Sequence, residues 1–406
     1  MSHAPTADHG AEAPNKLMTG DSFLESLRNG RQVFLDGELV KDVTAHPGFA
    51  NAAKSSAHLY DALHAPETKE PMTTVDRYTG HRVHRFFTPA RSAEELLKAR
   101  DVIEHWARLS YGFMNRTPDY KASFMAGLAV TDDFYAPYHG NARAWYEKYV
   151  TRGMAVSHAM VNPSVDRNKV SHEIGDVFIT VTEERDDGIA VSGAKMMATA
   201  SAPANAAFVG QIHLGTLQKG KAEDMALAFI APMNTPGMKG VCRTPYEKKA
   251  VSAFDNPLPS RFDENDAVLV FDNAFIRWEN VLIYRDTEKI HDYFPRSGLL
   301  SRGLFQGAVR MAVKLEFMVG ILDKGTRMNG DRGAIAGSAA ALIGFLMHII
   351  GAAMVARVGL AGRTSALPVG VITSALGIAA VPSFTLIARP PTAPAQLAPV
   401  STEAVR

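Results

Sequence analysis

An arginine and a tyrosine on either side of a proline are the first side chains in this sequence that could hold a ligand. They lie in the segment Tyr111-Gly-Phe-Met-Asn-Arg-Thr-Pro-Asp-Tyr120. Pro118 favours an extended conformation at the residue before it, and such a bend can direct Arg116 and Tyr120 into a common cavity. A structural role is the alternative, in which Arg116 pairs with Asp119 and Tyr120 packs in the core.

A second candidate is the single histidine in Ser157-His-Ala-Met-Val-Asn-Pro163, which runs on into Ser164-Val-Asp-Arg167. Polar and apolar residues mix there, where the pattern changes from helical to strand-like. A lone histidine is commonly a hydrogen-bonded structural residue. His158 by itself therefore leaves a structural and a chemical role open.

Metal and nucleotide signatures are weak. Neither G-x-G-x-x-G nor G-x-x-x-x-G-K-[ST] occurs, so a bound nucleotide would not use a Rossmann turn or a P-loop. His81 and His84 have a metal-ligand spacing, but they lie in a basic stretch without further ligands, so we expect them at the surface and predict no metal site. The acidic group Asp263, Glu264 and Asp266 is expected to be a solvated loop between strands.

Charge and cysteine content narrow the class of protein. The chain has 43 Lys and Arg against 42 Asp and Glu, so it has no overall field to attract nucleic acid or an anionic membrane. Its one cysteine, Cys242, cannot form an intramolecular disulfide, and its neighbours give no reason to expect a reactive thiolate. With no apolar N-terminal signal, we expect a reducing, cytoplasmic location.

The elements that must position these residues fall into helical and strand-rich blocks, which favours an α+β architecture. Ser92 and Glu95 form a capping-box pattern at the start of one helix, and Asp187-Gly188 is typical of the turn of a β-hairpin. The expected segments are a disordered leader at 1–16, a helical domain at 17–150, a strand-rich domain at 151–290, the start of a helical bundle at 291–330 and an apolar, Ala/Gly/Pro-rich tail at 331–406.

The tail differs from the rest of the chain. Residues 334–356 contain no Asp, Glu, Lys or Arg over 23 positions, which is long enough to span a bilayer. A second weakly charged stretch at 364–388 contains Pro368 and Pro382. Taken alone, the tail predicts one transmembrane helix, with the second stretch as a further candidate.

Nine segments upstream of the tail resemble the 4-hydroxyphenylacetate 3-hydroxylase family in order and approximate spacing. They are Thr19-Gly-Asp-Ser-Phe-Leu-Glu-Ser-Leu27, Val43-Thr-Ala-His-Pro47, Leu59-Tyr-Asp-Ala-Leu-His64, Arg108-Leu-Ser-Tyr-Gly112, Arg116-Thr-Pro-Asp-Tyr-Lys121, His158-Ala-Met-Val-Asn-Pro163, Ser192-Gly-Ala-Lys195, Ser260-Arg-Phe-Asp-Glu-Asn-Asp266 and Trp278-Glu-Asn-Val-Leu-Ile-Tyr-Arg-Asp286. The resemblance covers about residues 17–330.

The resemblance implies an acyl-CoA dehydrogenase-like fold with an N-terminal helical domain, a middle β-barrel and a C-terminal helical bundle. It also implies a two-component monooxygenase, whose FADH2 comes from a separate NAD(P)H-flavin reductase and reacts with O2 to give a C4a-hydroperoxide. The ring carbon ortho to a phenol hydroxyl then attacks the distal oxygen, converting 4-hydroxyphenylacetate or a close analogue to its catechol. Family members form homo-oligomers, either tetramers or dimers.

The resemblance also assigns residues. Arg116, Tyr120 and His158 match positions around the phenol hydroxyl and the peroxide. Arg116 would stabilise a developing anion. His158, which is able to titrate near neutrality, would accept the phenol proton. Tyr120 would donate a hydrogen bond. The matched FAD contacts are His158, Ala159, Met160, Ser164, Val165, Asp166, Arg167 near a phosphate and Thr199 near flavin N5, and a substrate-covering loop would contain Phe208 and Val209. The sequence of that loop departs from its relatives at 202–207, so the phenol is less well specified than the reaction.

The resemblance ends near residue 330, although family members continue for well over a hundred residues. An out-of-frame reading that leaves an incomplete, inactive oxygenase, a fusion, and a native tail that associates with membranes through 334–356 all stay open. The 4-hydroxybutanoyl-CoA dehydratase class shares the scaffold but needs several cysteines for an iron–sulfur cluster. Cys242 alone cannot supply them.

Overall fold

The structure is a computed structural model that describes residues 16–166, 168–211, 217–249 and 251–328. The chain divides into two compact units, 1–318 and 319–406, and the fold below is that of the first unit. Arg167, residues 1–15 of the predicted leader and the predicted tail with its 334–356 span lie outside the described residues. Within the described ranges, no helix is both long enough and apolar enough to cross a membrane.

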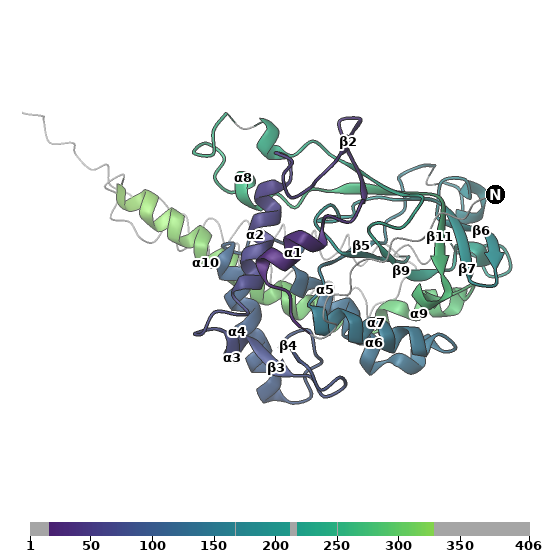
Figure 1. The fold of residues 1–406 in the computed structure, drawn as a ribbon, viewed down its shortest axis with the longest axis horizontal. Helices are drawn as coiled ribbons and strands as arrows, with labels where there is room; N and C mark the ends of the chain where they lie inside the picture. Colours follow the sequence, from purple (N-terminus) through teal and green to yellow (C-terminus); the bar gives the residue numbers. More distant parts are fainter. Residues whose placement is uncertain (1–15, 167, 212–216, 250, 329–406) are drawn as a thin grey trace, which may run out of the picture. The chain divides into compact units, whose positions relative to one another are not determined.

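Helices and strands mix in the order that an α+β protein would have (Figure 1). The α-helices are α1 (Gly20–Ser26), α2 (Ala50–Asp61), α3 (Lys69–Met72), α4 (Ala93–Leu109), α5 (Pro118–Met125), α6 (Gly127–Val130), α7 (His139–Arg152), α8 (Pro259–Phe262), α9 (Thr287–Arg296) and α10 (Leu299–Met328). The strands are β1 (Gln32–Leu35), β2 (Glu38–Val40), β3 (Thr73–Val75), β4 (Arg82–His84), β5 (Val156–Ala159), β6 (Thr180–Arg185), β7 (Gly188–Lys195), β8 (Ala206–Val209), β9 (Ala228–Pro232), β10 (Met238–Cys242), β11 (Ala267–Arg277) and β12 (Val281–Ile283).

Two larger sheets pack on each other. One has six strands in the order β2-β1-β10-β11-β7-β6, and the other has four in the order β12-β9-β8-β5. Apolar residues of both sheets form one buried cluster, in which Phe229 and Phe271 meet edge to face with ring centroids 5.8 Å apart. No strand pairing among the described residues closes these sheets into a barrel, so the expected barrel is here a pair of facing sheets.

Several predicted elements have different boundaries in the structure. The hairpin around Asp187-Gly188 is confirmed, because β6 and β7 pair antiparallel. The long strand β11 has a bulge between Phe271 and Ala274, where its register with β7 shifts. The stretch 17–150, predicted to be helical, also contains β1 and β2, and β1 pairs parallel with β10. The strand β1 is only four residues long, too short for its alternation to stand out.

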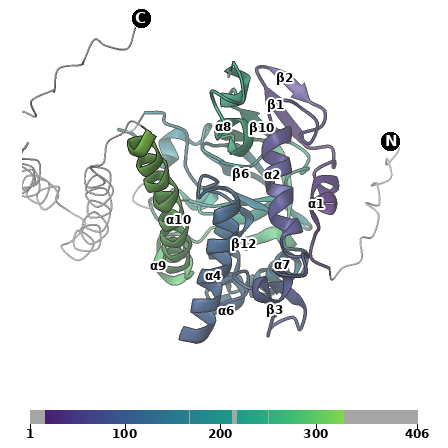
Figure 2. The same cartoon turned by 90° about the vertical axis from the view of Figure 1, so that its left-hand side faces the viewer.

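A core of aromatic residues holds the helical part together. The helix α4 begins as predicted, since the Ser92 hydroxyl accepts a hydrogen bond from the backbone N–H of Glu95 at 3.1 Å. Trp106 on α4 is fully buried and meets Tyr60 of α2 edge to face at 6.1 Å. The helices α2 and α4 are both visible in Figure 2. Phe87 and Tyr149 of α7 stack at 4.7 Å and extend the same core.

Candidate active site

Arg116 and Tyr120 come together at the start of α5. Thr117 is extended, with φ −49° and ψ 156°, and Pro118 is the first residue of the helix, as predicted. The guanidinium carbon of Arg116 lies 4.3 Å from the centroid of the Tyr120 ring, an attractive cation–π distance. Asp119 does not take Arg116 as its partner; its Oδ2 accepts a hydrogen bond from Gln306 of α10 at 3.4 Å.

Glu264 anchors the turn that carries Arg116. Its two carboxylate oxygens accept hydrogen bonds from the backbone N–H groups of Asn115 and Arg116, at 2.5 and 2.6 Å. Burial raises the pKa of this carboxyl to about 7, against the lowering effect of both hydrogen bonds and of Arg116. Arg116 and Glu264 also line one cavity. The Nε atom of Arg116 is buried and has no hydrogen-bond partner within the described part of the chain.

His158 reaches the same place from β5. This strand pairs parallel with β8, which puts His158 opposite Phe208 in the sheet. The imidazole lies 6.1 Å from the Tyr120 ring and 5.4 Å from the Phe124 ring, centroid to centroid. Its Nδ1 atom is 2.5 Å from Nζ of Lys121. The packing of β5 on α5 therefore brings His158 close to Tyr120, which in turn contacts Arg116.

The histidine is held in its neutral form. Burial lowers the pKa of His158 well below its usual value, and the neighbouring Lys121 and Arg116 lower it further. The prediction that His158 titrates near neutrality is therefore wrong for the protein without ligand. A neutral imidazole can still accept a proton, and it has a permanent cation nearby to stabilise the resulting anion.

Residues assigned to the flavin divide into two groups. Ala159 and Met160 are buried, at 0% and 2% exposure. Ser164 and Asp166 are exposed and Val165 is half-buried. These three side chains follow Val161 in the chain. Val161 forms an isolated β-bridge with Met196, the residue after the end of β7.

Thr199 lies in a turn with an unusual backbone. Met197 and Ala200 have positive φ, 59° and 57°, a conformation that side chains other than glycine seldom adopt and that gathers at functional sites. The apolar side chain of Met197 is 55% exposed beside it. The Thr199 hydroxyl donates to Oδ1 of Asp266 at 2.5 Å, so its oxygen is left to accept a hydrogen bond. An exposed apolar surface next to such an acceptor fits the edge of a reduced flavin, whose N5 carries a hydrogen.

Phe208 and Val209 are not part of a loop. They lie in β8 and are 0% and 1% exposed. The Phe208 ring packs on Phe124 at 5.5 Å and on Tyr293 at 5.6 Å. Phe208 thus supports the wall that faces His158, whereas the residues that follow β8 at 212–216 lie outside the described residues.

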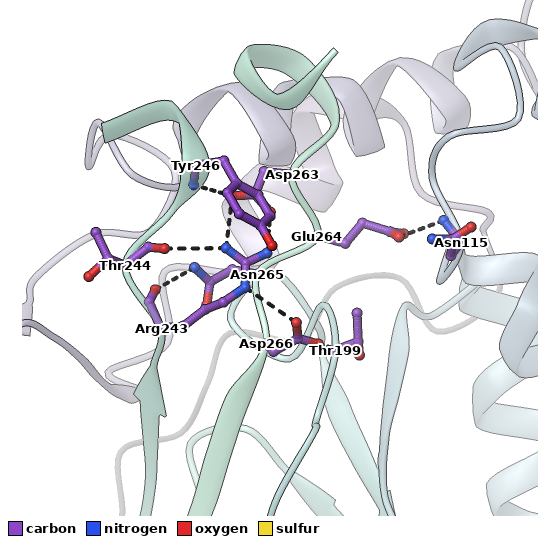
Figure 3. Close-up of polar contacts among 9 residues, drawn as sticks. All are labelled: Asn115, Thr199, Arg243, Thr244, Tyr246, Asp263, Glu264, Asn265 and Asp266. Carbon is purple, nitrogen blue, oxygen red and sulfur yellow. Dashed lines mark hydrogen bonds and ion pairs between the residues drawn. The ribbon is translucent and has the colours of Figure 1, made fainter. Parts of the chain in front are cut away.

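The acidic segment that we expected to be solvated is a polar junction instead (Figure 3). Asp263 is 6% exposed and pairs with Arg243, which also contacts Asp266. Glu264 holds the backbone at Asn115, and Asp266 holds Thr199. The prediction failed because the sequence of an acidic run does not show whether its carboxylates are solvated or accept hydrogen bonds from buried donors.

Lys121 was not singled out from the sequence, and the surface position expected for His84 is wrong. Lys121 is 1% exposed and touches His158, although its only signal was its place in the Arg116–Lys121 segment. His84 is fully buried against Trp106, with ring centroids 4.3 Å apart, rather than at the surface. Burial lowers the pKa of His84 to about 3. Across the described residues, no group of three His, Cys, Asp or Glu side chains is placed to hold a metal.

Comparisons with known proteins identify the family to which this sequence is similar. The family model described as "4-hydroxyphenylacetate 3-hydroxylase N terminal" matches residues 19–283. A pyoverdin chromophore biosynthetic protein of Pseudomonas aeruginosa is 52% identical over 319 residues, which cover 79% of this chain and 63% of the relative. The 4-hydroxyphenylacetate 3-monooxygenase oxygenase component of the same organism is 51% identical over 317 residues, covering 77% and 61%. The chain thus spans less than two thirds of the length of these relatives.

A solved structure has the same fold. The crystal structure of the oxygenase component of a 4-hydroxyphenylacetate 3-monooxygenase, in complex with FAD and 4-hydroxyphenylacetate, matches with a TM-score of 0.74 and 28% identity. The match covers 81% of this chain and 69% of that one. The α+β, acyl-CoA dehydrogenase-like fold expected from the sequence is confirmed.

Proposed function

This chain belongs to the 4-hydroxyphenylacetate 3-hydroxylase family, and we propose that it hydroxylates a phenol ortho to its hydroxyl group as a flavin-dependent monooxygenase. The convergence of Arg116, Tyr120 and His158 on one buried position carries this proposal. The substrate is 4-hydroxyphenylacetate or a close analogue. A separate NAD(P)H-flavin reductase supplies the reduced flavin, and the oxygenase works as a homo-oligomer.

Arg116, Tyr120 and His158 each have a different role toward the phenol. A phenol attacks oxygen through its ring carbon more readily when its hydroxyl is polarised or deprotonated. Arg116, whose buried Nε has no partner among the described residues, stabilises the phenolate oxygen. His158 accepts the phenol proton, because burial and the nearby Arg116 cation keep its ring neutral before substrate arrives. Tyr120, held against Arg116, donates a hydrogen bond to the same oxygen.

Reduced FAD supplies the electrons that activate O2 for transfer of one oxygen atom to the ring. We assign its contacts to Ala159 and Met160, to the 164–167 segment and to Thr199. The fit is supported by the strained turn at Met197 and Ala200 and by the Thr199 oxygen that is free to accept. Phe124 and Phe208 form an apolar wall beside His158 that keeps water from the reaction.

The test is product formation by the full chain. Purified protein is mixed with a flavin reductase, NADH, FAD and O2, and 4-hydroxyphenylacetate is followed to 3,4-dihydroxyphenylacetate by chromatography. The Arg116→Gln variant serves as a matched control, because it keeps the approximate size of the side chain and removes its charge. Hydrogen peroxide without any catechol, across a panel of para-substituted phenols, would contradict phenol hydroxylation. Failure to bind FADH2 in an anaerobic titration would contradict the flavin assignment.

A further inference from the structure

Lys121 is a buried lysine without an acidic partner at ion-pair distance among the described residues. It lies on α5 and is 1% exposed. Its Nζ atom contacts Nδ1 of His158 at 2.5 Å. A buried lysine without a paired carboxylate is costly as a cation, so its contact with a proton-accepting histidine points to a role in proton transfer.

The surroundings of Lys121 combine aromatic rings with charged groups. Its Nζ atom lies 4.7 Å from the centroid of the Tyr120 ring and 5.8 Å from that of Phe124. Arg116 and Glu264 act on it through space with opposite effects. Arg310 of α10 acts in turn on Glu264 and Arg116. The charged groups that act on the amine are therefore the Glu264 carboxyl and the Arg116 guanidinium.

The relay starts with the proton between Lys121 and His158 on the imidazole, a position that the 2.5 Å contact allows. Burial lowers the pKa of Lys121 well below its usual value, and Arg116 lowers it further, whereas Glu264 raises it. Burial and the Arg116 cation keep His158 neutral. A neutral amine accepts a hydrogen bond from Nδ1–H. That arrangement leaves Nε2 of His158 as a lone-pair acceptor for a phenol proton.

We propose that Lys121 is the final holder of the phenol proton: the phenol gives its proton to Nε2 of His158, and Nδ1 gives its own proton to Nζ of Lys121. The O–H and Nδ1–H bonds break, the Nε2–H and Nζ–H bonds form, and the imidazole stays neutral. After oxygen transfer the same path returns the proton to the phenolic oxygen, while the ring hydrogen leaves as a separate proton. Lys121 ends neutral, as it began. The relay rests on the proposed phenol hydroxylation.

The structure favours the lysine over the histidine as the site of the positive charge. An amine is in water a much stronger base than an imidazole, with pKa values of about 10.4 and about 6.5. The faces of Tyr120 and Phe124 stabilise a cation at Nζ. Glu264 adds an attraction that strengthens as soon as Lys121 is charged. The relay thereby leaves a phenolate between Arg116 and a neutral His158.

The experiment uses 4-nitrophenol as the probe, because the absorbance of its phenolate reports ionisation directly and without turnover. Difference spectra of 4-nitrophenol bound to the full, FAD-loaded chain are recorded across pH. The wild-type protein should bind the probe as phenolate at least one pH unit below the pH at which the free probe ionises. Lys121→Met and Lys121→Gln should each reduce the bound phenolate about tenfold at a given pH.

The two variants separate proton storage from simple positioning. The glutamine amide of the K121Q variant would still accept the hydrogen bond from Nδ1 but cannot take up a proton, so K121Q alone decides the question if K121M does not fold. Lys148→Met is the matched control, since Lys148 also lies over an aromatic ring, 4.5 Å from that of Trp145, on another helix. It should titrate the probe as the wild type does.

Two results would overturn the relay and leave the proposed function standing. In the first, both Lys121 variants titrate the probe as the wild-type protein does. In the second, K121Q behaves like wild type and only K121M is shifted, which would make Lys121 a positioning residue for the His158 ring. If the wild-type protein binds neither 4-nitrophenol nor any other phenol, both the proposed function and the relay are contradicted.

Discussion

Replacing Glu264 by glutamine should change how the stability of this protein depends on pH. Glu264 holds the turn that carries Arg116 through two backbone hydrogen bonds. Burial raises its pKa from 4.5 to about 7. Because the folded protein binds this proton more tightly than the unfolded chain, the stabilisation is complete below the unfolded pKa and is lost as pH rises through about 7.

The size of the effect follows from the pKa difference. Between about pH 5 and about pH 8, the free energy of unfolding of the wild-type protein should lose about 2–3 kcal/mol through this one group. Glutamine does not titrate, so the E264Q variant lacks this loss. Its amide can accept only one of the two backbone N–H bonds, which costs about 1–3 kcal/mol at any pH. That constant cost cancels when the two pH values are compared.

Urea unfolding of both proteins, followed by tryptophan fluorescence, measures the difference. Relative to wild type, E264Q should gain about 2–3 kcal/mol on going from about pH 5 to about pH 8. Glu38→Gln on β2, whose side chain is exposed, is the control, and its difference from wild type should be the same at both pH values. An E264Q difference that also stays constant would refute the argument that burial of Glu264 controls its ionisation.

Three further outcomes can be checked directly. Arg116→Gln and His158→Ala should each lower catechol formation about 10²-fold or more, and unchanged coupling of NADH use to product would return both residues to a structural role. Thr199→Val breaks the hydrogen bond to Asp266 and should lower the free energy of unfolding, measured by urea unfolding, by about 1 kcal/mol. If Thr199→Val costs the same free energy in a protein that already carries Asp266→Ala, that pairing is contradicted. Burial raises the pKa of Cys242 to about 12, so iodoacetamide should label it at about pH 8 only after unfolding, as mass spectrometry would show.

Part of the candidate site could be predicted from sequence because its causes are local. Pro118 restricts the residue before it, and this restriction fixes the bend that brings Arg116 and Tyr120 together four residues apart. The hairpin at Asp187-Gly188 and the start of α4 at Ser92 depend on equally short-range preferences. His158 came from the family resemblance, since its strand and α5 meet only in the folded chain.

The remaining properties depend on contacts between distant segments. Glu264 lies 148 residues from Arg116 in the sequence, and Lys121 lies 37 residues from His158. Neither contact can be predicted from the residues close to it in the sequence. The sequence by itself determined the family and the α+β class, and it supplied the residues of the proposed site. Only the tertiary structure decided that Lys121 is buried, that Glu264 binds the backbone of Arg116, that burial lowers the pKa of His158 and that Phe208 is in a strand. The reason is that ionisation follows desolvation and nearby charge, which the folded chain creates by bringing remote residues together.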